Sequence, residues 1–155
     1  MLLLTMLPVY GKGGVEKDMG AYLFTFFNDP THSLFMAVSY DGYTFTAVNE
    51  GQPVISGDSI AAQRGIRDPH IYRAPNGMFY IAMTDLHVFG KQRGLRDTQW
   101  ERDDKYGWGN NRGLVLMKSK DLIHWTHTEV FVNETFPENF GELGCAWAPQ
   151  TIWDP

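Results

Sequence analysis

The sequence predicts an all-β protein, and three observations support that prediction. Apolar residues fall in short runs rich in β-branched and aromatic side chains, and almost no stretch has the periodicity of an amphipathic helix. Residues that favour turns separate those runs. One segment made of a strand-like run, a turn and a second run also occurs twice along the chain.

The apolar runs are expected to be strands, and the residues between them are expected to be turns. In chain order the runs cover residues 21–27, 33–38, 70–72, 78–83, 114–117 and 129–132. The turns include Asn28-Asp29-Pro30, Asp41-Gly42, Pro75-Asn76-Gly77 and Asn110-Asn111. Many short strands at regular spacing are typical of sandwiches, barrels and propellers.

An internal repeat selects among these architectures. Segment 34–46, LFMAVSYDGYTFT, aligns without a gap with segment 114–126, LVLMKSKDLIHWT, so Ser39 matches Ser119 at an offset of 119 − 39 = 80. The pair Asp68-Pro69 matches Ala148-Pro149 at the same offset, since 149 − 69 = 80. One repeat then holds a proline-led strand, a hairpin, a second strand, a long loop, a third strand, a Ser-x-Asp turn and a fourth strand. Such a four-stranded unit is the blade of a β-propeller.

Both copies of the Ser-x-Asp motif are expected to be structural. Serine and aspartate side chains accept hydrogen bonds from nearby backbone N–H groups and so fix a tight turn. The aromatic residue four positions after the aspartate then starts the outer strand and packs between blades.

The composition excludes some classes of partner. Lys plus Arg number 13 and Asp plus Glu 18, which gives a net charge of −5, and no basic cluster stands out. Nucleic acid is therefore a poor partner, whereas a neutral oligosaccharide or polysaccharide would not be repelled. The single cysteine, Cys145, can form no internal disulfide, and no Cys/His group has zinc spacing, so no metal ligand is assigned.

The chain is expected to divide into two parts. Residues 1–20 begin with MLLLTMLPV, which is too short to span a membrane and suits a signal-peptide remnant or an N-terminal strand. The signal-peptide interpretation of this segment favours a secreted or periplasmic protein over a cytoplasmic one. Residues 21–155 are expected to form the N-terminal part of a propeller domain.

The segment 86–111 lies between two expected strands and mixes aromatic with charged side chains. Loops this long inside compact domains are usually functional or disordered, and the aromatics argue against disorder. We interpret it as a surface loop that walls a binding cleft, with Trp100 and Trp108 as candidate substrate-binding residues.

Asp68 is the candidate catalytic residue. It belongs to Arg67-Asp68-Pro69 at the head of the first strand of the complete repeat, and the innermost strand of a blade lines the propeller's central channel. Pro69 cannot donate a ladder hydrogen bond, which suits the first residues of a strand. Taken alone, an Arg-Asp pair is more often a local ion pair or a turn cap.

Three segments in this order resemble glycoside hydrolase family 43. They are residues 65–85, GIRDPHIYRAPNGMFYIAMTD, residues 119–126, SKDLIHWT, and residues 145–154, CAWAPQTIWD. The resemblance implies a five-bladed β-propeller that hydrolyses arabinofuranosyl or xylosyl linkages of plant polysaccharides with inversion and requires no cofactor. This chain would hold closing strands of the last blade in residues 21–54, the first blade, and the start of the second.

The resemblance also implies roles for single residues. Asp68 matches the aspartate that acts as general base on the attacking water. Arg67, Trp147 and Asp85 are candidate substrate-binding residues, although Trp147 also suits packing between blades and Asp85 also suits a turn cap. In the family, the glutamate that acts as general acid and the aspartate that tunes it lie on later blades, and no residue of this chain matches either. Gln150 stands where relatives often carry an acidic residue.

Several alternatives stay open. His70 should point in the same direction as Asp68, so it suits either packing or the axial channel, where some propellers of this type hold a structural cation. Asn28-Asp29-Pro30 resembles the nucleophile motif of fructan-hydrolysing propellers, which carry Arg-Asp-Pro on a different blade. Here less than one repeat separates the two motifs, since 68 − 29 = 39. A non-catalytic carbohydrate-binding propeller would keep the same aromatic cleft.

The repeat also gives an expectation about completeness. By the offset of the repeat, Asp154-Pro155 matches Ala74-Pro75, which stand just before the expected hairpin at Asn76-Gly77. We therefore expect a fragment of a longer protein or one half of a split enzyme. Alone it should be inactive, and it should aggregate or bind a complementary chain through its open sheet edge.

Overall fold

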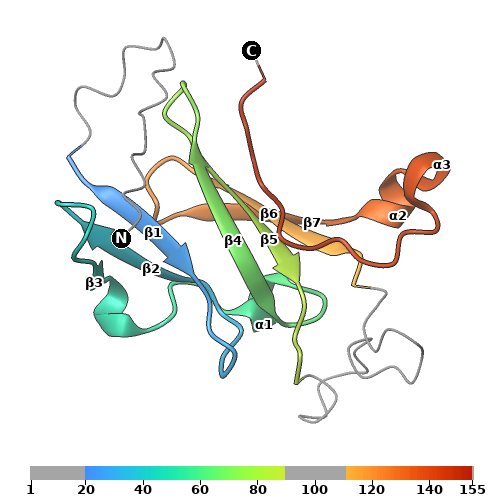
Figure 1. Ribbon diagram of the computed structural model, residues 1–155, viewed down its shortest axis with the longest axis horizontal. Helices are drawn as coiled ribbons and strands as arrows, with labels where there is room; N and C mark the ends of the chain where they lie inside the picture. The colour runs from blue at the N-terminus through green and yellow to red at the C-terminus, as the bar shows by residue number, and fades with distance from the viewer. Residues whose placement is uncertain (1–19, 90–110, 155) are drawn as a thin grey trace, which may run out of the picture.

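The computed structural model describes residues 20–89 and 111–154, which form two antiparallel sheets joined by short helices (Figure 1). The first sheet has the order β1 (Tyr22–Phe26), β2 (Phe35–Ser39) and β3 (Thr46–Ala47). The second has the order β4 (Ile66–Arg73), β5 (Phe79–Asp85), β6 (Gly113–Ser119) and β7 (Trp125–Phe131). The helical turns are η2 (Asn49–Gly51), α1 (Gly57–Ile60), α2 (Val132–Thr135) and α3 (Pro137–Phe140). The prediction of an all-β fold is confirmed.

Each sheet is a meander in which strands adjacent in sequence are also hydrogen-bonded neighbours. The turn between β4 and β5 is the hairpin that the sequence predicts. There the Gly77 N–H donates to the Ala74 carbonyl at 2.9 Å, and the Ala74 N–H donates to the Met78 carbonyl at 2.8 Å. Gly77 has φ +81°, a conformation that side chains with a Cβ rarely adopt, so glycine suits this position.

The two Ser-x-Asp turns, which join β2 to β3 and β6 to β7, have the same hydrogen-bond network. In the second turn the Ser119 hydroxyl accepts the N–H groups of Asp121 and Leu122 at 3.1 and 2.9 Å. The Asp121 carboxylate accepts the N–H groups of Ile123 and His124 at 2.9 and 2.8 Å. In the first turn Ser39 and Asp41 accept the corresponding four N–H groups at 2.8–3.3 Å. The expectation that the serine and aspartate side chains of the motif fix a tight turn is therefore confirmed.

These hydrogen bonds also set the ionisation of the turn carboxylates. Backbone N–H donors, led by that of Thr44, hold the pKa of Asp41 well below its usual range. For Asp121 the largest contribution is the His124 side chain, whose Nδ1 lies 2.8 Å from the carboxylate, and the backbone donors lower the pKa further.

The hydrophobic core lies between the two sheets. Buried residues alternate with more exposed ones along β6, and its buried residues Val115 and Met117 belong to the core cluster. The core side chains of the second sheet are Ile66, Ile81, Met83, Val115 and Met117. They are clustered with Met36 of β2 and with Leu34, which directly precedes that strand.

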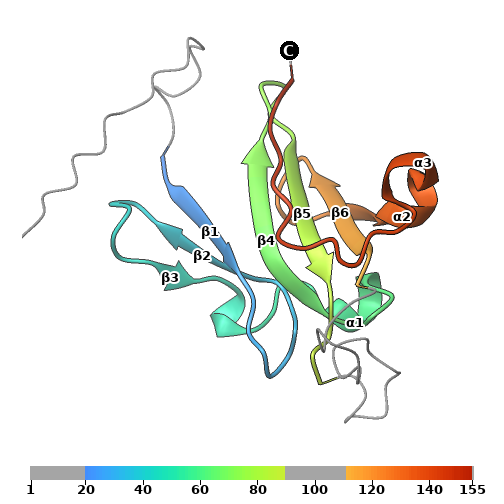
Figure 2. The same cartoon turned by 45° about the vertical axis from the view of Figure 1, so that its right-hand side comes forward.

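Strand β1 lies beside β4, so the inner edges of the two sheets meet (Figure 2). The Thr25 hydroxyl on β1 donates to the Pro69 carbonyl on β4 at 3.3 Å. Strands β1 to β3, which the family resemblance assigns to a last blade as closing strands, form a three-stranded sheet. Within the described residues, no helix has the length and apolar character needed to cross a bilayer.

Candidate active site

Asp68 lies on an irregularity of strand β4. Arg67 pairs with Thr84 and His70 pairs with Ala82, so Asp68 and Pro69 together lie opposite a single residue of β5. Asp68 has φ +50°, in the left-handed region that aspartate tolerates better than most residues. Pro69 has no backbone N–H to donate, and at this irregularity the ladder requires no donor from it. Bulges of this kind redirect a side chain out of the strand's regular alternation.

The redirected carboxylate of Asp68 meets Thr84. The Thr84 hydroxyl donates to Oδ2 of Asp68 at 3.2 Å, and the same hydroxyl oxygen accepts the N–H of Ala148 at 2.9 Å. Thr84 is 1% exposed, so water has almost no access to its hydroxyl. One buried side chain therefore joins the end of β5 to Asp68 and to the segment after α3.

The segment after α3 contacts the four-stranded sheet at several points. Cys145 forms an isolated parallel bridge with Asn111, two residues before β6, and the Ala148 N–H donates to Thr84 of β5. Further along, the Thr151 N–H donates to Nδ1 of His70 at 3.2 Å, and the Thr151 hydroxyl lies 3.0 Å from that nitrogen. A neutral His70 ring then carries its proton on Nε2.

Ala148 repeats the backbone geometry of Asp68. It has φ +48° and precedes Pro149, just as Asp68 has φ +50° and precedes Pro69. Positive φ is uncommon for residues other than glycine and strained for alanine. The internal repeat is therefore present in the backbone as well as in the sequence.

A small pocket opens where these two segments meet. Its volume is about 210 Å³, and it is lined by Asp68, Pro69, His70, Ala148, Pro149 and Gln150. Pockets that bury drug-sized ligands are larger, roughly 300–1,000 Å³. The space beside Asp68 therefore suits one small ring or part of one.

Arg67 is held by two residues of the first sheet's first hairpin. Its Nη1 atom lies 2.6 Å from Oδ1 of Asp29, and its guanidinium carbon lies 4.5 Å from the centre of the Phe27 ring. The side chains of Arg67 and Asp29 are 22% and 54% exposed. The sequence leaves a local ion pair open at Arg67, but it does not identify Asp29 as the partner.

The Asn28-Asp29-Pro30 turn is an ordinary turn in its geometry. The Asn28 side chain accepts the N–H of Thr31 at 3.0 Å, and its backbone carbonyl accepts the N–H of His32 at 2.8 Å. The motif lies between β1 and β2 of the first sheet, whereas Arg67-Asp68-Pro69 lies on β4 of the second, although less than one repeat separates the two motifs in the sequence.

The other candidate residues differ in their surroundings. Asp85 is fully buried, and both of its carboxylate oxygens accept the N–H of Gln63, at 2.8 and 2.9 Å, so it anchors the loop before β4. Trp147 directly precedes Ala148 and is 38% exposed. Trp100 and Trp108 lie outside the described residues. Across residues 20–89 and 111–154, no group of three or more His, Cys, Asp or Glu side chains could hold a metal ion.

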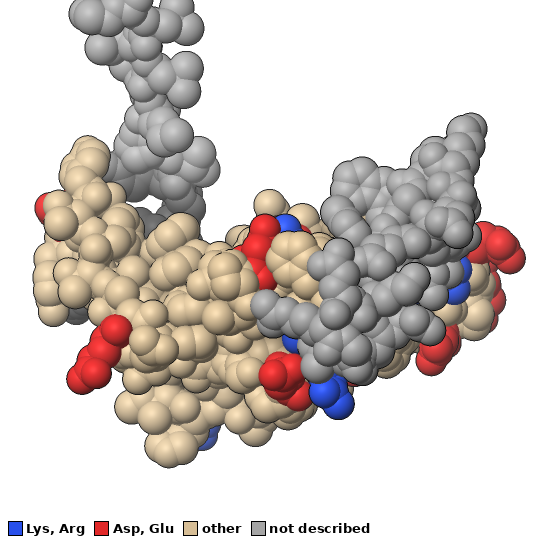
Figure 3. All heavy atoms as spheres, turned by 90° about the horizontal axis from the view of Figure 1, so that it is seen from below, with Lys and Arg blue, Asp and Glu red and all other residues tan. Residues whose placement is uncertain are grey.

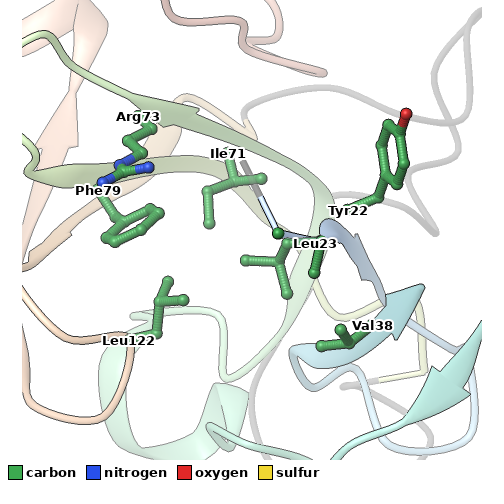
Figure 4. A pocket seen from close by; sticks show the side chains of 9 residues that line it. Tyr22, Leu23, Val38, Ile71, Arg73, Phe79 and Leu122 are labelled. Atoms are coloured by element: carbon green, nitrogen blue, oxygen red, sulfur yellow. The ribbon is translucent and has the colours of Figure 1, made fainter. Parts of the chain in front are cut away.

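A second cavity lies toward the other end of β4 (Figure 4). It measures about 300 Å³ and is lined mainly by apolar side chains of both sheets, with Arg73 stacked over Phe79 at its rim. Its lining residue Ile71 lies three positions after Asp68, roughly 10 Å along the strand. This cavity is therefore separate from the pocket at Asp68.

Charge on the described surface is dispersed. On the face shown in Figure 3, acidic and basic side chains are scattered among neutral ones, and the described atoms of that face form no broad basic patch.

At the start of the segment after α3, burial raises the pKa of the Cys145 thiol.

A family comparison identifies what kind of domain carries this geometry. The model of the family described as "Probable glycosyl hydrolase domain", which is related to glycoside hydrolase family 43, matches residues 17–155. The chain belongs to this family of glycosyl hydrolase domains. The expected resemblance to family 43 is thereby confirmed.

A curated relative agrees with that membership. The glycosyl hydrolase domain is 30% identical over 120 residues to a protein named "Alpha-L-arabinofuranosidase" from Bifidobacterium longum subsp. longum. The aligned region covers 74% of this chain and 10% of the relative, so the chain spans about a tenth of the relative's length. No solved structure matches the chain.

Two contacts of the site were missed from the sequence. Thr84 directly precedes Asp85. The alternation of β5 places Thr84 on the face opposite the core, and this alternation is the signal by which the sequence could have identified it. Asp29 stands in the second Asp-Pro dipeptide of the chain, but its contact with Arg67 crosses between sheets and gives no periodic signal.

Proposed function

We propose that this domain hydrolyses arabinofuranosyl or xylosyl linkages of plant polysaccharides with inversion, and that Asp68 is the general base. The observation that carries the proposal is the carboxylate of Asp68 on a strained bulge, held by Thr84 at the wall of a pocket. Unusual backbone conformations of this kind concentrate at active sites. The arabinofuranosidase named among the relatives supports the choice of sugar.

In the proposed reaction a water molecule lies between Asp68 and the anomeric carbon of the sugar. Asp68 takes a proton from this water as its oxygen forms the new bond to the anomeric carbon. The glycosidic bond breaks on the opposite face, and its oxygen leaves with a proton from a general acid elsewhere in the protein. The two carboxyl groups of inverting enzymes lie roughly 6.5–9.5 Å apart, which leaves space for the water.

We also propose that the two sheets are neighbouring units of a five-bladed propeller. The four-stranded sheet has the strand order expected of one blade, with β4 innermost. The edges of the two sheets meet at β1 and β4. Ala148, which precedes Pro149, has the same positive φ as Asp68, which precedes Pro69 on β4. These features support a radial arrangement of repeats in which further sheets complete the ring.

The decisive experiment replaces Asp68 with asparagine in the protein that carries this domain. Turnover of an aryl arabinofuranoside or xyloside should fall at least 10²–10⁴-fold, the usual contribution of a general base. The matched control is Asp58→Asn, which removes an exposed carboxylate on α1 and should leave turnover unchanged. Wild-type turnover in a folded Asp68→Asn protein would rule out the proposed role.

A second candidate function is supported by the contact between Asp29 and Arg67. It is a fructan-hydrolysing activity in which Asp29 attacks the sugar as a nucleophile and the product keeps its anomeric configuration. Proton NMR of the first product formed distinguishes the two, since inversion supports Asp68 as base and retention supports Asp29 as nucleophile. Sugar binding with no turnover of either substrate class would instead indicate a non-catalytic binding propeller.

A polymeric plant substrate would be met outside the cell. We therefore propose that the protein acts after secretion or in the periplasm, with the polysaccharide as its binding partner. Fractionation of the producing cells tests this, and enzyme confined to the cytoplasm would contradict it.

A further inference from the structure

Thr84 occupies the point where three segments of the chain meet at the proposed site. It lies on β5 opposite Arg67, its hydroxyl donates to Oδ2 of Asp68 at 3.2 Å, and it accepts the N–H of Ala148 at 2.9 Å. The side chain is 1% exposed. Its two hydrogen bonds are therefore made within the protein rather than shared with bulk water.

The direction of these hydrogen bonds follows from counting protons. A threonine hydroxyl has one proton and can also accept, whereas a backbone N–H can only donate. The oxygen of the Thr84 hydroxyl accepts the Ala148 N–H, so the proton of the hydroxyl is available to donate to Asp68. A hydrogen bond to a carboxylate is charge-assisted and stronger than one between neutral groups.

We propose that Thr84 is a positioning residue for Asp68, and that Ala148 fixes the orientation of Thr84. Holding Oδ2 leaves Oδ1 of Asp68 to take the proton from the attacking water. A carboxylate free to rotate would present this oxygen in the productive direction for only part of the time. The inference rests on the proposed role of Asp68 as general base.

The substitutions that test the proposal differ in one group each. Thr84→Val keeps the branched shape and removes the hydroxyl, whereas Thr84→Ser keeps the hydroxyl and removes the methyl group. The valine variant should reduce kcat on an aryl arabinofuranoside about 10–100-fold, on the scale of one hydrogen bond to a charged group, with KM within about twofold of wild type. The serine variant should retain kcat within about threefold.

A double-mutant cycle separates positioning from a purely structural role. Thr84→Val also leaves the Ala148 N–H without its acceptor, so it is expected to lower stability as well as turnover. If Thr84 acts through Asp68, adding Thr84→Val to Asp68→Asn should not reduce the residual turnover further. If Thr84 is only structural, the valine substitution should reduce turnover by the same factor in both backgrounds.

Three results would show that Thr84 does not position Asp68. Unchanged kcat in Thr84→Val, a loss confined to KM, or equal losses in both backgrounds would overturn the proposal while leaving Asp68 in place. Wild-type turnover in Asp68→Asn would remove the proposed function and this inference with it. If Thr84→Val does not give a folded protein by circular dichroism, Thr84→Cys replaces it, because a thiol is a weak donor of similar size and should also lower kcat.

Discussion

The contact between Asp29 and Arg67 allows a prediction in which stability and activity separate. Asp29→Asn removes the charge that holds Arg67 at 2.6 Å, while the stacking of Arg67 on Phe27 remains. The pair is partly exposed, with side-chain exposures of 22% and 54%, so its loss should change the free energy of unfolding by less than about 1 kcal/mol. Arg67 is a candidate substrate-binding residue, and its guanidinium group should then sample other orientations. We expect KM for an aryl arabinofuranoside to rise about tenfold, which corresponds to roughly 1.4 kcal/mol of binding, with kcat little changed.

Steady-state kinetics and urea denaturation test this prediction together. Asp58→Asn is the matched control, since it removes an exposed carboxylate from α1 and should alter neither KM nor the denaturation midpoint. Raising the salt concentration should increase KM of the wild-type protein more than that of Asp29→Asn, because salt screens exposed ion pairs. Wild-type KM in Asp29→Asn would show that Arg67 needs no clamp or does not bind substrate. A loss of several orders of magnitude in kcat would instead favour Asp29 as the nucleophile.

Two further predictions concern the scaffold. Ile66→Ala should destabilise the protein by about 2–5 kcal/mol in urea denaturation, because it removes three carbons of a fully buried side chain, at roughly 0.8 kcal/mol each, and leaves a cavity. The control is Ile123→Ala, at a position that is 75% exposed, and its stability should stay within about 0.5 kcal/mol of wild type. Asp121→Asn should lower the melting temperature at neutral pH, because the ionised carboxylate stabilises the turn. The pKa of Asp121 in the folded protein lies below its ordinary value of 3.8, so the difference in melting temperature should shrink as the pH falls below 3.8 and the carboxylate becomes protonated. A difference that stays constant with pH would contradict the role of the charge.

Local features of the fold could be predicted from the sequence because short-range chemistry determines them. The hairpin at Asn76-Gly77 needs a residue that adopts positive φ, and glycine supplies it. The Ser-x-Asp turns need side-chain acceptors two residues apart, and both copies make the same hydrogen bonds. The strand β4 was predicted too short, since the bulge at Asp68 and Pro69 interrupts the alternation on which strand prediction depends.

The contacts that shape the candidate site could not be predicted in the same way. Asp29 and Arg67 are 38 residues apart in the sequence, and Thr84 and Ala148 are 64 apart. Periodicity indicates which face of a strand a residue occupies, but it does not indicate which residue of another segment lies against it.

The comparison of Asp68 with Ala148 indicates what makes this position suited to chemistry. Both residues have φ near +50°, both precede a proline, and both contact the hydroxyl of Thr84. Alanine has no side-chain group that could stabilise the left-handed conformation, which disfavours it by roughly 1–2 kcal/mol. The surrounding repeat must therefore impose this backbone geometry, and the carboxylate of Asp68 is not needed to create it. It follows that Asp68→Asn should leave the bulge intact, so a loss of turnover in that variant can be assigned to the missing carboxylate rather than to a rearranged strand.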